Sequence, residues 1–351
     1  MHWERDEATL LMNRVIEELI CYKHFPVLSV IASLGLAGHE NEMKLRRVLA
    51  HAFDLTPKSL LKVDRDIFFA RLELMLSNLS TDGYPESVAL FVGKDFTRIV
   101  PLNYAVRDRI VIDGSCALSE VVYSSTMFPC FNVIVLYSTQ ARIFKTCAER
   151  LLEIKNCQLV DHLSSLLKNH VDAINASRQD NGKHGKTSSS YAHKLHHAFL
   201  ALLRNLDHPA IIIGSDRIGQ LCPEMTKYVS GFAEGDYEYV SNAEIGRLAA
   251  EMADAWVKSK MRQGMAAIEN YRHYKKLGSG VDEVEALVEE GCVEKLYLEA
   301  LQATTVELCD SHRLTEIDKI ISSAYKSEAE IFFLPAGSLS AYNGMAAGLR
   351  Y

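Results

Sequence analysis

Residues 280–299 read GVDEVEALVEEGCVEKLYLE, and this stretch decides the fold of the last part of the chain. It predicts a helix over 281–290 and a buried strand over 293–299, because Gly291 is a typical helix stop and the strand is largely apolar. The packing face of the helix is supplied by Ala286, Leu287 and Val288. The stretch therefore predicts a helix packed on a sheet.

The alternation of helix and strand continues on both sides of this block. Residues 316–325 have helical spacing, and EIFFLP at 330–335 predicts a further strand. A long helical pattern over 242–274 precedes the block, and we place a domain boundary within it near Ala255. Residues 255–351 are therefore expected to form a layered α/β domain.

The middle of the chain predicts a second sheet with helices. Adjacent strands are expected over 131–138, 141–146 and 150–155, and AIIIG at 210–214 is typical of a buried central strand. Helices are expected over 159–173, 191–206 and around 218–229. The stretch 175–190 is polar and rich in Gly, Ser and Lys, which predicts an exposed loop. We assign this domain to residues 130–254.

The N-terminal part predicts a third α/β domain over 1–129. Helical spacing is found over 7–22, 40–53 and 58–79, and strand-like runs occupy 27–34, 87–92, 97–102 and 108–113. A chain of 351 residues also exceeds the roughly 100–200 residues of one domain. The sequence thus predicts a three-domain α/β architecture with mixed sheets and helices packed on them.

Composition limits the classes of function. Hydrophobic residues at 48% and charged residues at 24% are typical of a globular protein, and the net charge of −7 restricts any contact with nucleic acid to local patches. No apolar run approaches the ~20 residues of a membrane span, so we expect a cytoplasmic protein without membrane or DNA partners.

No metal or cofactor is expected from the motifs. The eight cysteines form no Cys-x-x-Cys pair and are expected to be reduced core residues, while Cys309 and His312 make only half of a zinc site. Gly185-Lys186-Thr187 could end a phosphate-binding Walker A loop, but Asp180 stands where its first glycine is required.

Two blocks in the last domain resemble the third domain of the archaeal and eukaryotic class-one release factor and Pelota superfamily. They are residues 280–299 and the final GMAAGLRY at 344–351, which is similar to the family ending Gly-Ile-Ala-Ala-Ile-Leu-Arg-Tyr. Gly348 departs from that ending, because it replaces a branched aliphatic residue. The order and approximate separation of the blocks match the family, so the resemblance implies its three-domain architecture.

The middle domain resembles the family around NGKHGKTSSSYAHKLH at 181–196. Family members carry Lys-His-Gly-Arg before a catalytic Gly-Gly-Gln, and here 183–186 read KHGK while 187–189 read TSS. Thr187 pays a steric cost in the positive-φ conformations open to glycine. Hydrolysis of peptidyl-tRNA by the family route is therefore not expected, and the chain resembles a bacterial branch that includes the hibernation factor Balon.

Two basic groups are predicted to bind RNA. In the region of the predicted loop the residues are Arg178, Lys183, His184, Lys186, Ser188, Ser189, His193, Lys194 and His197. In the N-terminal domain they are Arg46, Arg47, Lys58 and Lys62. Runs of charged residues often contribute only to solubility. The resemblance to the family is the reason to expect that these residues contact RNA phosphates.

The resemblance implies a ribosome-binding translation factor that is not an enzyme and acts by occupying the A site, in hibernation or ribosome rescue. The implied partners are ribosomal RNA and a translational GTPase similar to elongation factor Tu. Two alternatives remain open. One is a hydrolase of peptidyl-tRNA or RNA that uses His184 or the serines near His193, and the other is an adaptor that works without the ribosome.

Overall fold

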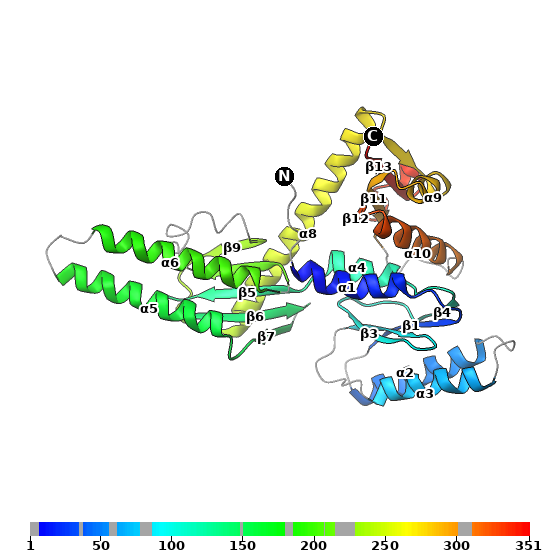
Figure 1. Ribbon diagram of the computed structural model, residues 1–351, viewed down its shortest axis with the longest axis horizontal. Coiled ribbons are helices and arrows are strands. Elements are labelled where there is room, and N and C mark those ends of the chain that lie inside the picture. The colour runs from blue at the N-terminus through cyan, green and yellow to red at the C-terminus, as the bar shows by residue number, and fades with distance from the viewer. Residues whose placement is uncertain are drawn as a thin grey trace. The chain divides into compact units, whose positions relative to one another are not determined.

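The computed structural model describes residues 7–34, 38–55, 62–77, 86–147, 150–179, 185–206, 208–214, 229–300 and 311–351. The chain forms two compact units, one made of residues 1–13 with 129–258 and the other of residues 14–128 with 259–351. Three mixed or antiparallel sheets carry the helices (Figure 1). The expected α/β fold class is confirmed, and the division into three domains stays a prediction.

A five-stranded sheet forms the centre of the first unit, in the order β7-β6-β5-β8-β9. Its strands are β5 (Phe131–Leu136), β6 (Ala141–Cys147), β7 (Arg150–Glu153), β8 (Ala210–Gly214) and β9 (Gly231–Glu234). The pairs β5-β6 and β6-β7 are antiparallel, whereas β8 runs parallel to β5 and β9. β5 and β8 are buried throughout, which explains their nearly continuous apolar sequence.

Helices cover both faces of this sheet. The pair α5 (Gln158–Gln179) and α6 (Gly185–Arg204) packs on one face through Ile134, Ile143 and Ile212 of the sheet. The first part of α8 (Asn242–His273) packs on the other through Ile245 and Ala249. Successive side chains of a strand point to opposite faces of the sheet, so alternate residues of β5 contribute to the two hydrophobic cores.

The second unit begins with an antiparallel sheet in the order β3-β2-β1-β4. The strands are β1 (Val27–Ser33), β2 (Ser87–Val92), β3 (Thr97–Leu102) and β4 (Arg109–Asp113). α2 (Gly38–Leu55) and α3 (Lys62–Ser77) pack on one face of it. α1 (Glu7–Cys21) and α4 (Ser119–Met127) lie on the other face (Figure 1).

The second unit also contains a sheet in the order β10-β13-β11-β12. It consists of β10 (Leu277–Ser279), β11 (Val293–Glu299), β12 (Glu330–Leu334) and β13 (Met345–Leu349), and a short 3-10 helix, η2 (Ser340–Tyr342), precedes β13. α9 (Val281–Glu289) and α10 (Ser311–Lys326) contact each other beside this sheet. The last turns of α8 pack on it through Ile268, against Tyr297 and Leu334.

A buried ionic cluster joins β4 and α4 to α10 within the second unit. Arg109 of β4 donates to both carboxylate oxygens of Glu120 at 2.9 and 3.0 Å and to Asp318 of α10 at 2.7 Å. Asp318 also accepts the backbone N–H groups of Leu118 and Ser119, at 2.8 and 2.7 Å. The N-terminus of α4 is therefore capped by a carboxylate from a distant helix.

The cysteine prediction requires a correction. Cys130 is disulfide-bonded, and Cys21 is exposed, so the expectation of eight reduced core thiols is wrong. The physical reason is that a disulfide depends on which distant positions the fold brings within bonding distance, and the spacing of cysteines along the sequence does not contain that information. Cys116 fits the expectation, since it is free and buried. Burial raises the pKa of its thiol to about 12.

Candidate RNA-binding surface

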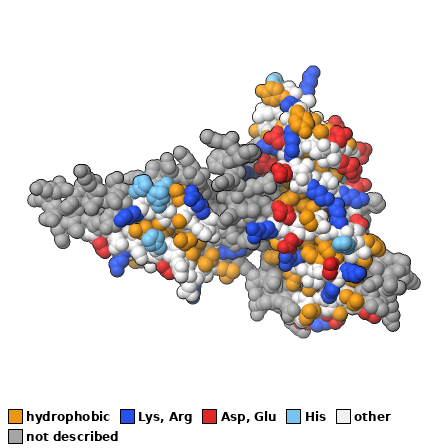
Figure 2. Space-filling model, viewed as in Figure 1, with side chains coloured by type: hydrophobic (Ala, Val, Ile, Leu, Met, Phe, Trp, Pro, Cys, Tyr) orange, Lys and Arg blue, Asp and Glu red, His pale blue; other side chains and the backbone are white. Residues whose placement is uncertain are grey.

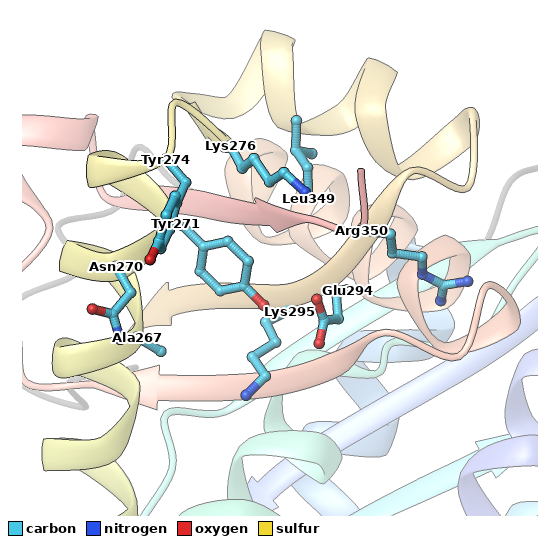
Figure 3. A pocket seen from close by; sticks show the side chains of 9 residues that line it. All are labelled: Ala267, Asn270, Tyr271, Tyr274, Lys276, Glu294, Lys295, Leu349 and Arg350. Carbon is cyan, nitrogen blue, oxygen red and sulfur yellow. The ribbon is translucent and has the colours of Figure 1, made fainter.

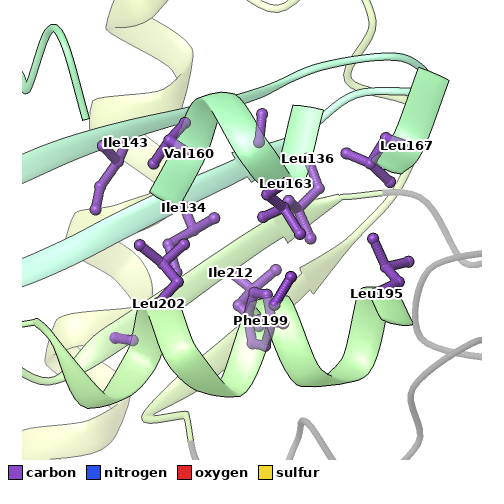
Figure 4. Close-up of a cluster of buried hydrophobic side chains, with 13 residues drawn as sticks. Ile134, Leu136, Ile143, Val160, Leu163, Leu167, Leu195, Phe199, Leu202 and Ile212 are labelled. Atoms are coloured by element: carbon purple, nitrogen blue, oxygen red, sulfur yellow. The ribbon is translucent and has the colours of Figure 1, made fainter. Parts of the chain in front are cut away.

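The α5-α6 hairpin carries most of the predicted RNA-binding residues. Leu163 and Leu167 of α5 pack with Leu195, Phe199 and Leu202 of α6 and with the sheet below (Figure 4). Because these α6 residues recur at spacings of three and four, one side of the helix is apolar and buried. The opposite side of α6 is left for polar residues.

The structure corrects the predicted loop. Residues 175–179 continue α5 and residues 185–190 form the start of α6, so 175–190 is not one exposed loop. A helix already held by apolar contacts extends through polar residues at low cost, since each added residue gains one backbone hydrogen bond. The expected helix around 218–229 overlaps residues 215–228, which lie outside the described residues.

Three predicted contact residues are described with their side chains in this unit, and all are exposed: His193, Lys194 and His197. Figure 2 shows histidines gathered over the hairpin, next to lysine and arginine side chains. The other predicted residues are described less fully. Arg178, Lys186, Ser188 and Ser189 lie in helical backbone, and Lys183 and His184 are outside the described residues.

The solvent side of α6 has a defined pattern. At 3.6 residues per turn, positions 193 and 197 lie about 40° apart on the helix, nearly opposite Leu195. The rings of His193 and His197 have centroids 4.7 Å apart and planes inclined by 47°. Position 186 and the exposed Arg204 fall on the same side by periodicity. One face of the helix therefore carries a line of basic positions, and those at 193, 197 and 204 are exposed.

The second basic group lies in the other unit. Arg46 and Arg47 are exposed on α2, and Arg46 forms an ion pair with Glu42 at 3.0 Å, one turn away. Lys58 lies outside the described residues, and of Lys62 only the helical backbone is described. A surface pair between neighbouring turns is worth about 0.3–0.5 kcal/mol and leaves the guanidinium open to other partners.

Sequence reasoning missed a pocket of about 510 Å³ in the second unit. It lies between the end of α8 and the neighbouring sheet, and Figure 3 shows its lining residues. These are Ala267, Asn270, Tyr271, Tyr274, Lys276, Glu294, Lys295, Leu349 and Arg350. Burial raises the pKa of the Tyr271 hydroxyl, and a hydrogen bond to Glu294 raises it further.

The Tyr271 ring lies where a side chain at position 348 would be. A Cβ built on Gly348 would come within 2.5 Å of Tyr271 Cε2, closer than any real contact. This explains why position 348 carries glycine. Gly348 is the sequence signal that could have indicated the ring, because a glycine inside a strand is typical of a site where another group approaches the backbone closely.

Among the residues that the structure describes, none of the helices combines the length and the apolar character that a membrane span requires. Nor do these residues place three or more His, Cys, Asp or Glu side chains where they could hold a metal ion.

No protein-family model matches the sequence, and no curated protein sequence matches it. Solved structures align with it over most of its length. The archaeal translation termination factor aRF1 has 15% identity and a TM-score of 0.27, with 99% of this chain and 98% of that chain covered. Dom34 of S. cerevisiae, a translation termination-like factor involved in RNA quality control and interacting with Hbs1, has 14% identity, 78% and 77% coverage, and a TM-score of 0.41.

Archaeal Pelota, in a model of its ribosome-bound form with ABCE1, has 12% identity and a TM-score of 0.40, with 97% of this chain and 94% of that chain covered. These similarities therefore extend over most of the chain at low identity.

Proposed function

We propose that the protein is a translation factor that binds the ribosomal A site and blocks it by occupancy, without hydrolysing peptidyl-tRNA. The observation that supports this proposal is that the two blocks that resemble the family, residues 280–299 and 344–351, contribute neighbouring strands to one sheet. Residues 293–299 are β11, and β13 at 345–349 is its antiparallel neighbour, with Leu296 opposite Ala347 and Tyr297 opposite Ala346. Segments that resemble the family in sequence are thus neighbouring strands of one sheet.

The hairpin supports the absence of hydrolysis. Residues 187–189, which stand at the Gly-Gly-Gln position in the resemblance, continue the helical backbone of α6. Thr187, Ser188 and Ser189 each carry a Cβ, so their backbone pays a steric cost in the positive-φ conformations open to a glycine loop. The basic side of α6 supports contact with ribosomal RNA.

In this proposal, the protein blocks the A site in the same way whether it acts in hibernation or in ribosome rescue. A GTPase similar to elongation factor Tu is the proposed partner of its C-terminal part.

The first test is sucrose-gradient sedimentation of the tagged protein from growing and starved cells. We expect cosedimentation with 70S ribosomes or large subunits, with enrichment after starvation if the role is hibernation. A protein that stays in the ribosome-free fractions under both conditions would overturn the proposal.

The second test uses the basic hairpin. Replacing Lys183, Lys186 and Lys194 together with alanine should lower ribosome affinity and flatten its salt dependence, by about one unit of slope per lost duplex-like phosphate contact. The matched control replaces the exposed Lys94, Lys275 and Lys319, which changes the charge equally. Equal affinity and slope in both triple variants would show that the hairpin does not contact RNA.

A further inference from the structure

His193 and His197 form a candidate chelating pair on the exposed side of α6. They lie one turn apart, and among the 13 histidines of the sequence no other two are spaced by four positions. Both side chains are exposed, while Leu195 between them is buried in the hairpin core. The backbone that carries them is therefore fixed by packing, and the rings are open to solvent.

The geometry of the two rings suits one shared ion. Zinc binds imidazole nitrogen at about 2.0–2.1 Å, and two rings on one tetrahedral ion then have their centres roughly 5 Å apart. The observed separation is 4.7 Å, and the rings are tilted by 47° rather than stacked. Two histidines at this spacing on one helical face are also the arrangement that helical zinc sites use.

We propose that His193 and His197 together bind one divalent transition-metal ion of the zinc and copper class. Imidazole nitrogen is a favoured ligand for these ions, in contrast to Mg²⁺ and Ca²⁺, which prefer oxygen. Water completes the coordination, because the described residues provide no third His, Cys, Asp or Glu at the site. The ion bridges one turn of α6 and leaves positions open for an exchangeable oxygen ligand.

The test is isothermal titration of the full chain with zinc chloride. Wild type should bind one ion at this site, and His193→Ala and His197→Ala should each lower its affinity at least tenfold. The matched control is His162→Ala, which removes an exposed histidine from the neighbouring α5 and should leave binding unchanged. Circular dichroism without metal should show the same helix content in all four proteins.

A second readout is the thermal midpoint with and without zinc, since an ion that binds only the folded chain raises it. The rise should be present in wild type and His162→Ala and absent in the His193→Ala/His197→Ala double variant. Undiminished zinc binding in the double variant would overturn the proposal, as would absence of binding to wild type. Both readouts are independent of ribosome binding.

Discussion

Arg109 and Asp318 are 209 positions apart in the chain, and Nη2 of Arg109 donates to Oδ2 of Asp318 at 2.7 Å in the interior of the second unit. Their side chains, and that of Glu120, are 7–9% exposed. Burial lowers the pKa of Arg109, but the carboxylates of Glu120 and Asp318 outweigh it and raise the pKa overall. The cluster links the N-terminal sheet to α10 by charge as well as by packing.

Replacing Arg109 with methionine should destabilise the fold strongly. It leaves two carboxylates buried without their cation, and breaking a buried pair in this way costs about 3–5 kcal/mol. Urea unfolding measures the loss. The control is Arg46→Met, which removes an exposed pair and should change the free energy of unfolding by less than about 1 kcal/mol. Equal effects of the two changes would contradict the structural role of the cluster.

Glu120 should make stability depend on pH. Burial raises its pKa above the ordinary value, Arg109 opposes this and Asp318 adds to it. The folded protein then holds this proton more tightly than the unfolded chain, so this contribution to stability is lost as pH rises through the window between the ordinary and the raised pKa. Glu120→Gln should flatten that part of the curve in urea unfolding across pH, and an unchanged slope would refute the assignment. Glu42→Gln, at an exposed site, serves as the control.

Gly348 and Tyr271 should be energetically coupled. Gly348→Ala places its Cβ against the Tyr271 ring, and overpacking of this kind costs about 1–3 kcal/mol. In a Tyr271→Ala background the penalty should shrink, giving a coupling energy of about 0.5–3 kcal/mol in a double-mutant cycle. Gly114→Ala is the control, because nothing lies within 4 Å of a Cβ there. Additive effects would mean that the ring can move away freely.

The disulfide of Cys130 should have Cys147 as its partner, because Phe131 pairs with Thr146 and extending this register by one position would place Cys130 opposite Cys147. Peptide mapping without reductant should find the two linked. Closing a loop of this length is worth about 3 kcal/mol, so reduction should lower the thermal midpoint of wild type but not of Cys147→Ser. Cys21→Ser, at a free exposed cysteine, should behave as wild type does. Linkage of Cys130 to any other cysteine would refute the pairing.

The purified protein should release no peptide from a programmed ribosome at any stop codon, since residues 187–189 are Thr-Ser-Ser in a helical backbone. Release of labelled peptide, with an active release factor as the positive control, is the measurement. Stop-dependent release would favour the hydrolase alternative.

Most elements with strong periodicity could be predicted from the sequence, including β2, β3 and β8 with the observed bounds. α4 could not. Its N-cap residue, Leu118, offers no side-chain hydrogen bond, and the capping carboxylate comes from Asp318, 200 positions away. A local pattern does not contain that information, because tertiary contacts supply the missing stabilisation.

The candidate surface was predicted as residue types but not as geometry. The basic and histidine-rich composition of 178–197 was visible in the sequence, whereas the 4.7 Å approach of His193 and His197 depends on α6 being helical there. Both histidines lie in the helix predicted over 191–206, but helical spacing alone does not fix the distance between two rings, which also depends on their side-chain rotamers. The pocket beside Tyr271 depends on a contact between the end of α8 and β13, which are distant in sequence.

The fit between Gly348 and Tyr271 also has a consequence for descent. A side chain at position 348 and an aromatic ring at position 271 would occupy the same space, so the residue at each position limits what the other can carry. The two positions should therefore change together among relatives of this chain. A genome search for small residues in the final block, paired with an aromatic residue near the end of the long helix, would collect the proteins that share this pocket and separate them from those in which the space is filled.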